Sequence, residues 1–176
     1  MFKILPTMIL VGVAYLRTLG GFFQHDEWPT FARFFTDGLN SLQRFTSFFT
    51  PNVSHWVPFS DALYYLLFSI FKMNFIGWAI ISILLHLITV YLVYLLAFRL
   101  FKNERSSVLT ALIFGVSGSA YQATSWMATT VNTHGAVIFG LLSLIFFIDK
   151  KYFKAFIFLI ISLLFMNPSG DFTTIL

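Results

Sequence analysis

Residues 75–98, FIGWAIISILLHLITVYLVYLLAF, form a run of 24 residues without a formal charge. An α-helix rises about 1.5 Å per residue, so this run would be roughly 36 Å long and would cross about 30 Å of hydrocarbon. Uncharged apolar runs of this length are typical of membrane helices and rarely occur in the core helices of soluble domains. The stretch therefore predicts a transmembrane helix.

The composition of the whole chain also indicates a membrane protein. Hydrophobic residues make up 58% of the 176 residues and charged residues 10%, whereas soluble domains contain about 45–50% and about 25%. Cysteine is absent, which excludes disulfides and thiolate metal sites. The net charge is +4. The basic residues lie in short loops beside apolar runs, which is typical of topology determinants and argues against nucleic-acid binding.

Four further apolar segments lie before and after residues 75–98. We therefore expect an all-α fold, a polytopic transmembrane helix bundle of about five membrane segments. Together they form part of a single transmembrane domain over residues 1–176. The expected spans are residues 4–23, 75–98, 108–123, 131–148 and 155–166.

Residues 24–74 differ from the rest because they contain most of the acidic residues and three prolines. Between Phe31 and Phe49, apolar side chains recur at steps of three and four, which predicts amphipathic interfacial helices. Residues 59–71 are apolar but only 13 residues long, so we expect an interfacial or re-entrant segment.

The distribution of Lys and Arg predicts the orientation. Short cytoplasmic loops are enriched in these residues, and seven of the eleven fall at the N-terminus or in two short loops. We therefore expect a multi-pass protein with a cytoplasmic N-terminus and an external loop at residues 24–74. The plasma membrane of a prokaryote fits this pattern. The seven are Lys3, Arg99, Lys102, Arg105, Lys150, Lys151 and Lys154.

Adjacent carboxylates at Asp26 and Glu27 open the external loop. A carboxylate at this position could accept a proton from a hydroxyl nucleophile or hold a divalent cation. The alternative is a solvated loop with ordinary acidic residues, and the pair alone favours that alternative.

Other polar residues fall near the same ends of the expected spans and suggest a cavity, because polar side chains seldom face lipid. The residues that we expect to bind substrate are His55, Gln122, Trp126, Asn132 and His134. The alternative is that such residues only hold helices together through hydrogen bonds. His86, in the middle of the long run, fits a hydrogen bond to a neighbouring helix better than a proton carrier. No metal-binding or phosphate-loop motif occurs.

The order of several loose motifs resembles the GT-C superfamily of membrane glycosyltransferases, in particular the protein O-mannosyltransferase-like group and its TPR-bearing transmembrane members. The likeness covers roughly residues 5–170. It rests on Asp26-Glu27, His55-Trp56-Val57-Pro58-Phe59, Asn74-Phe75-Ile76-Gly77-Trp78, Ile83-Leu84-Leu85-His86-Leu87, Arg99-Leu100-Phe101, Ala111-Leu112-Ile113-Phe114-Gly115 and Gln122-Ala123-Thr124-Ser125-Trp126.

The resemblance implies transfer of a sugar from a polyprenyl-phosphate donor to a hydroxyl of an acceptor protein or glycan. It implies Asp26, then Glu27, as the catalytic base, with membrane lipids around the protein and no resident cofactor, although a divalent metal could assist. Full-length enzymes of this type are much longer, so we expect the chain to be an N-terminal portion.

Two departures from the family pattern leave alternatives open. Ser117-Gly118-Ser119 replaces a His-Pro element, and Asn167-Pro168 replaces a Lys-Glu element. The second departure removes a cation that could contact a donor phosphate. The alternatives are a non-catalytic multi-pass subunit and a transporter fragment, although no internal repeat supports a transporter.

Overall fold

The computed structural model describes residues 2–24, 27–36, 38–50 and 56–165. Every regular element in these ranges is a helix and none is a strand, so the all-α prediction is confirmed. Two helices, α5 (Phe75–Phe101) and α8 (Met127–Ile148), are long and apolar enough to cross a membrane. The run that predicts a transmembrane helix thus lies within one uninterrupted helix, three residues longer at its C-terminal end.

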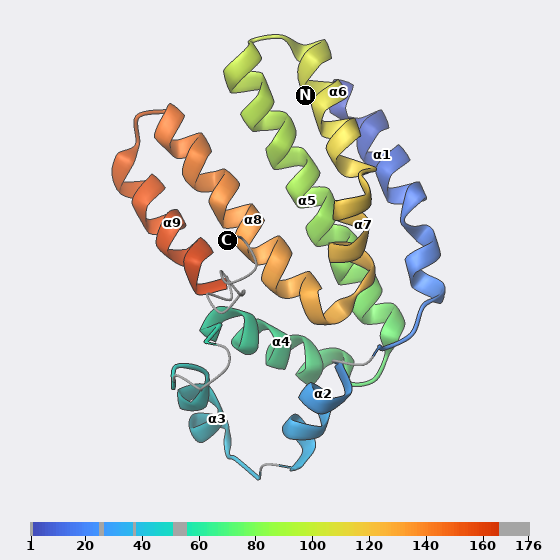
Figure 1. The fold of residues 1–176 in the computed structure, drawn as a ribbon, viewed down its shortest axis with the longest axis vertical. Coiled ribbons are helices and arrows are strands. Elements are labelled where there is room, and N and C mark those ends of the chain that lie inside the picture. The colour runs from blue at the N-terminus through green and yellow to red at the C-terminus, as the bar shows by residue number, and fades with distance from the viewer. Residues whose placement is uncertain (1, 25–26, 37, 51–55, 166–176) are drawn as a thin grey trace, which may run out of the picture.

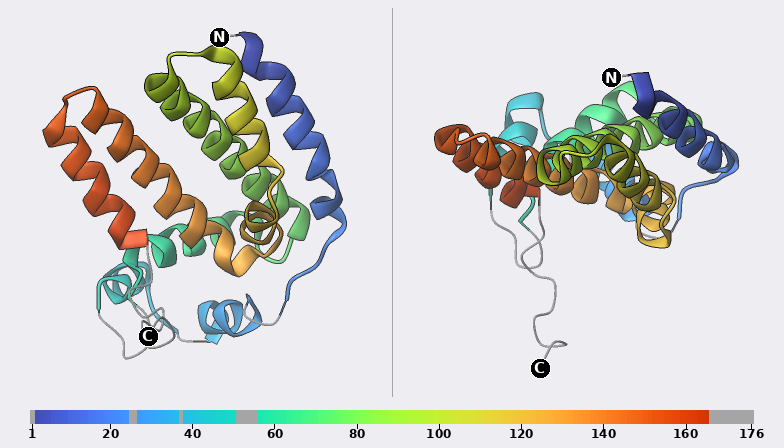
Figure 2. Two further views of the ribbon diagram at one scale, coloured as in Figure 1. Left: turned by 45° about the horizontal axis from the view of Figure 1, so that its top comes forward. Right: turned by 90° about the horizontal axis from the view of Figure 1, so that it is seen from above.

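Five helical segments run in alternating directions, and each packs against a neighbour (Figure 1). Seen from above, they form a flattened arrangement with α9 at one edge and α1 at the other (Figure 2). The segments are α1 (Leu5–Ala14) with the short 3₁₀ helix η2 (Leu16–Gly20), α5, α6 (Glu104–Gly115) with α7 (Gly118–Ser125), α8, and α9 (Tyr152–Phe165).

The third segment differs from its prediction, because residues 108–123 do not form one helix. The chain leaves the helical path after Gly115 and begins α7 at Gly118. Ser117 caps the new helix, since its Oγ accepts a hydrogen bond from the Ala120 N–H at 3.4 Å. A Cβ at Gly115 would lie 2.6 Å from a methyl of Val11. The glycine therefore lets α6 approach α1 closely at the point where the helix ends.

The predicted external loop contains three helices that lie across one end of the bundle (Figure 1). They are α2 (Glu27–Thr36), α3 (Ser41–Phe48) and α4 (Pro58–Phe71). The apolar stripe between Phe31 and Phe49 is divided between α2 and α3, and Gly38 lies between them with a φ of +61°. This left-handed conformation favours glycine and ends the first helix.

Aromatic packing attaches this end to the bundle. Phe31 of α2 stacks on Phe68 of α4, with ring centroids 5.3 Å apart, and lies 5.5 Å from Trp78 of α5. Tyr64 of α4 lies 4.8 Å from the same Trp78 ring. Buried aromatic side chains contribute large apolar areas and restrict geometry, so α2 and α4 are held firmly against the start of α5.

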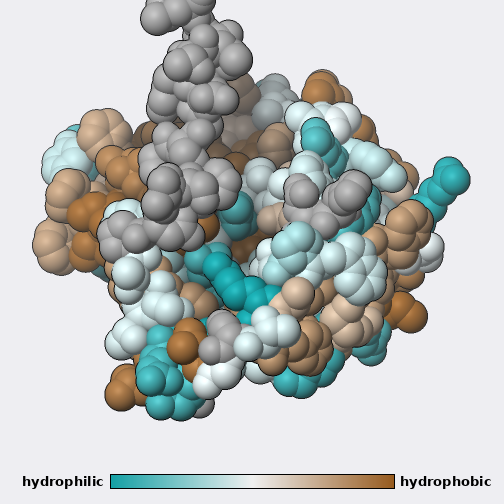
Figure 3. Space-filling model, turned by 60° about the horizontal axis from the view of Figure 1, so that its bottom comes forward, coloured by the Kyte–Doolittle hydropathy of each residue, from teal (hydrophilic) through white to brown (hydrophobic). Residues whose placement is uncertain are grey.

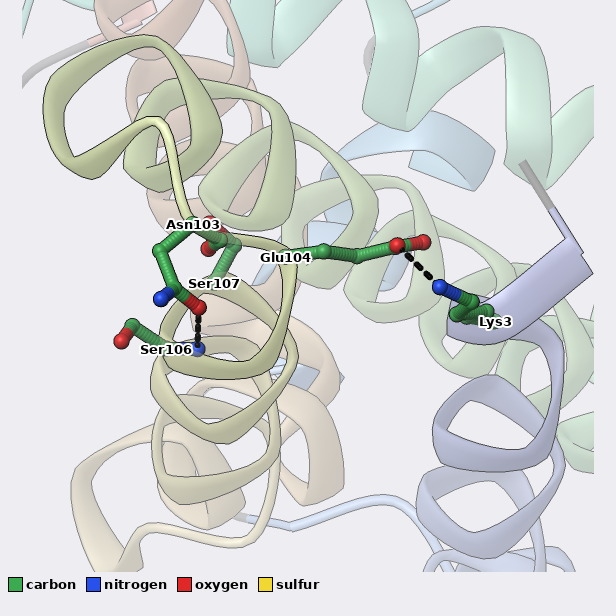
Figure 4. A network of polar contacts seen from close by, with 5 residues as sticks. All are labelled: Lys3, Asn103, Glu104, Ser106 and Ser107. Carbon is green, nitrogen blue, oxygen red and sulfur yellow. Dashed lines mark hydrogen bonds and ion pairs between the residues drawn. The ribbon is translucent and has the colours of Figure 1, made fainter.

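Polar contacts join the helix ends at the opposite end of the bundle. Lys3 Nζ lies 2.6 Å from Glu104 Oε2, which ties the 3₁₀ turn before α1 to the start of α6 (Figure 4). Asn103 caps α6 by accepting a hydrogen bond from the Ser106 N–H at 3.1 Å. Both contacts lie on the surface, where ion pairs contribute little to stability.

A second ion pair at this end joins the last turn of α5 to the C-terminal end of α8. Arg99 binds Asp149 in a bidentate manner, with Nε–Oδ1 and Nη2–Oδ2 distances of 2.9 and 3.1 Å. The short loops after these two helices and the N-terminus therefore lie together, away from α2, α3 and α4 (Figures 1 and 2). This placement agrees with the predicted separation of a basic end from an external end. Which end faces the cytoplasm stays a prediction.

Candidate functional site

Glu27, one member of the acidic pair, is buried at the start of α2 and is only 1% exposed. Its Oε2 accepts a hydrogen bond from the Gln24 N–H at 2.7 Å, and its Oε1 accepts one from the Ala128 N–H at 3.0 Å. Ala128 lies in the first turn of α8, where N–H groups lack partners within the helix. The carboxylate therefore caps a helix 101 residues further along the chain.

Burying a carboxylate is costly unless hydrogen bonds and a favourable potential offset the cost. Glu27 obtains both, because charge-assisted hydrogen bonds are strong and a helix N-terminus attracts negative charge. Each of its oxygens binds a backbone N–H. The geometry suits Glu27 to position the chain at the end of the bundle and leaves it poorly placed to exchange protons with a substrate.

Tyr64 of α4 lies near this carboxylate. Burial raises the pKa of the Tyr64 hydroxyl, and the charge of Glu27 raises it further. The hydroxyl is enclosed and forms no hydrogen bond with the described residues. Tyr64 is therefore a neutral group at ordinary pH that retains an unused hydrogen-bond donor beside Glu27.

The structure describes five of the seven residues predicted to form the site. Asp26 and His55 lie outside the described residues. Gln122 is exposed on α7. Trp126 and Asn132 are half-buried, and the indole N–H of Trp126 is enclosed without a partner among the residues that the structure describes. Glu27 and His134 are buried.

His134 lies inside the bundle in a group of buried polar side chains. Its Nε2 lies 3.2 Å from Thr124 Oγ1 of α7, and its Nδ1 lies 3.4 Å from Thr89 Oγ1 of α5. The His134 ring is 5.6 Å from the ring of His86. His134 is only 3% exposed, so it joins three helices in the interior and does not line the outer surface with Gln122.

The same group of side chains binds carbonyls that the helix breaks leave without partners. Gly115 ends α6, and His86 Nε2 lies 2.9 Å from its carbonyl oxygen. Near the end of α7, Ser82 donates to the carbonyl of Thr124, and Thr130 donates to that of Ala123 at 3.0 Å.

Buried polar groups in a low-dielectric interior require such partners. The role of His86 thus matches the simpler sequence interpretation, a hydrogen bond to a neighbouring helix.

A polar pocket of about 400 Å³ lies at the end of the bundle that carries α2–α4. η2, the segment that follows it, the first residue of α5 and the C-terminal part of α7 form its walls. Figure 3 views this end of the molecule, where hydrophilic and hydrophobic groups lie side by side on the surface. The lining includes Arg17, Thr18, Gln24, Tyr121 and Ser125.

Neither Arg17 nor Thr18 was assigned to the site from the sequence. The available signal was the dipeptide Arg17-Thr18 followed by Gly20-Gly21 at the end of an apolar run. Small residues after polar ones leave space for a ligand, but this pattern is too common to indicate a site by itself.

Among the described residues, no group of three or more His, Asp or Glu side chains could hold a metal ion. No family model, curated protein or solved structure matches the chain. The function therefore has to be argued from the residues and their geometry.

Proposed function

We propose that the five helical segments cross a membrane, with the end that carries α2–α4 on the external side. Large apolar side chains on α1 and α9 support this proposal, because they point away from the bundle. Large exposed apolar patches are unfavourable in water and favourable in lipid. They include Leu5, Ile9, Leu10 and Val13 on α1, and Phe153, Phe156, Leu159, Ile160 and Leu163 on α9.

Within this arrangement, we propose that the protein acts in the transfer of a sugar from a polyprenyl-phosphate donor to an acceptor hydroxyl. The observation that carries the proposal is the anchoring of Glu27. Its carboxylate binds the first turn of α8 through the Ala128 N–H and also accepts a hydrogen bond from the Gln24 N–H. Gln24 also lines the polar pocket. We infer that Asp26, which stands between these two residues in the sequence, acts at this pocket.

The two acidic residues then have different roles. The Asp26 carboxylate accepts the proton of the acceptor hydroxyl as its oxygen bonds to the anomeric carbon of the sugar. The bond between that carbon and the phosphate oxygen breaks, and the phosphate leaves with its electron pair. Polar donors near the pocket stabilise the developing charge. Glu27 is a positioning residue, because its oxygens already bind two backbone N–H groups.

The test is a transfer assay with membranes that contain the chain and a radiolabelled polyprenyl-phosphate mannose. Label should enter the protein or glycan fraction, and Asp26→Asn should abolish this transfer without lowering the yield of folded protein. Glu104→Gln at the opposite end of the bundle is the matched control and should transfer normally. Transfer by Asp26→Asn at the unsubstituted rate would refute the catalytic role.

A non-catalytic multi-pass subunit is the second candidate. Glu27 favours it, because one of the two adjacent carboxylates caps α8 and has both oxygens bound to backbone N–H groups. Folded, unsubstituted chain that transfers no label from any polyprenyl-phosphate sugar would favour this candidate.

A further inference from the structure

The pocket at the end of the first segment has one charged side chain among the described residues that line it. This side chain is Arg17, which is exposed at the rim. No ion pair or hydrogen bond engages the Arg17 guanidinium among the described residues. Glu27, the nearest described acid along the chain, has both oxygens bound to backbone N–H groups. An unpaired guanidinium with several donors is suited to an oxyanion.

Thr18 provides a second and independent observation. Its residue is only 7% exposed, and its Oγ1 is fully enclosed without a hydrogen-bond partner in the described structure. Buried hydroxyls almost always have a partner, and the exceptions require an explanation. Since Thr18 lines the pocket, a rotation of its side chain that turns the enclosed Oγ1 toward the pocket would let an acceptor oxygen of a bound ligand complete its hydrogen bonding.

The remaining walls favour a compact polar ligand. Gln24 and Ser125 add side-chain donors on two other elements. A Cβ at Gly20 would meet no atom within 4 Å, whereas a Cβ at Gly21 would lie 2.9 Å from the Phe75 ring. Gly21 therefore lets the backbone pass close to the start of α5.

We propose that this pocket binds a phosphate group, with the Arg17 guanidinium and the Thr18 hydroxyl as its main donors. A phosphate offers several acceptor oxygens around one centre, which suits donors that converge from η2, the following segment and α7. The group could belong to a lipid headgroup at the membrane surface or to a free phosphate. The inference does not depend on glycosyl transfer, since a non-catalytic subunit could bind the same group.

The test uses the full chain purified in a neutral detergent. Dihexanoyl phosphatidic acid and, separately, inorganic phosphate are titrated while tryptophan fluorescence and the thermal unfolding midpoint are measured. We expect Arg17→Gln to weaken binding at least tenfold. Arg105→Gln, which removes an exposed arginine at the opposite end, is the matched control and should bind as the unsubstituted chain does.

Thr18→Val separates ligand binding from a purely structural role. Valine has the same shape and lacks the unpaired hydroxyl, so the free protein should be as stable as the original or more stable. Binding should nevertheless weaken severalfold. A Thr18→Val protein that unfolds at a lower temperature and binds normally would contradict the assignment of Thr18.

The ligand series identifies the source of the phosphate. Binding of phosphatidic acid alone supports a lipid headgroup, and comparable binding of inorganic phosphate supports a free phosphate. Equal losses in Arg17→Gln and Arg105→Gln would show only nonspecific charge attraction. That result, or binding by neither ligand, would overturn the proposal.

Discussion

Replacement of Glu27 by glutamine should destabilise the protein markedly, although it changes one atom. The glutamine carbonyl can accept only one of the two hydrogen bonds that the carboxylate receives from Gln24 and Ala128. Its amide nitrogen would then face the other backbone N–H, and two donors cannot pair. The substitution also removes a negative charge from the N-terminus of α8.

The magnitude follows from these two losses. A buried donor without a partner costs about 1–3 kcal/mol. A charge at a helix N-terminus contributes about 0.3–1 kcal/mol on the surface and up to about 2 kcal/mol when partly buried. Glu27 is 1% exposed, so solvent cannot replace either contribution. We therefore expect a loss of about 2–4 kcal/mol in the free energy of unfolding.

The assay is denaturant unfolding in detergent micelles, monitored by tryptophan fluorescence. Trp126 and Trp28 lie within two residues in sequence of Ala128 and Glu27, so the signal should report on this region. Glu104→Gln is the control, because it makes the same chemical change at an exposed ion pair with Lys3. Such pairs contribute little, so its unfolding curve should nearly match that of the original protein.

The comparison of the two glutamine variants decides whether Glu27 is a helix cap. Equal unfolding curves for Glu27→Gln and Glu104→Gln would refute the reasoning, since they would show that the buried hydrogen bonds contribute no more than the exposed pair. A large loss in Glu104→Gln alone would refute it as well.

Substitutions at His86, at two glycines and at Asp149 test other parts of the fold. His86→Leu leaves a buried carbonyl at the end of α6 without its donor and should lower the free energy of unfolding by about 1–3 kcal/mol. His86→Gln retains a donor and should recover part of that loss in the same unfolding assay. Gly135→Ala places a Cβ against an aromatic ring of α9 and should cost about 1–3 kcal/mol. Gly140→Ala, whose Cβ would meet its nearest atom at 3.4 Å, should be tolerated when thermal unfolding is compared. The hydrogen bond from Arg99 lowers the pKa of Asp149 below its ordinary value of 3.8. The ion pair should therefore stabilise the protein above about pH 4 and lose this effect as the pH falls through the lowered pKa. Asp149→Asn should accordingly differ from the original protein near neutral pH and converge with it in acid, and a difference that grows in acid would contradict this sign.

Hydropathy predicted the two long helices that are apolar along most of their length. The run of residues 75–98 lies within α5, and residues 131–148 lie within α8, which begins four residues earlier. The length of an apolar run is a property of the local sequence. Lipid or a buried interior stabilises a helix formed by such a run, and no contact with a particular distant residue is required. The C-terminal ends of both helices coincide with short charged loops, which the sequence also displays.

Local sequence could not predict the role of Glu27, because the contact that defines it joins residues 101 positions apart. The adjacent carboxylates look equivalent in sequence. The hydrogen bond from the start of α8 to Glu27 is what gives this residue a role of its own. The same reason applies to Thr18, whose hydroxyl is buried by η2 and its neighbours. Burial by distant elements is a tertiary property, so composition and spacing do not reveal it.

The break between α6 and α7 links the polar residues of the interior to the shape of the fold. A continuous helix would pair its own carbonyls, and the polar side chains of α5 and α8 would then have no acceptors. The break after α6 exposes the carbonyl of Gly115, and the end of α7 exposes those of Ala123 and Thr124. The separate helix α7 also brings Tyr121 and Ser125 to the pocket. Because unpaired carbonyls are costly in a low-dielectric interior, we expect the break to persist only while His86, Ser82 and Thr130 bind them. The interior hydrogen bonds therefore support the pocket from within, and loss of the His86 donor should weaken phosphate binding at Arg17 without any change to the pocket's own residues.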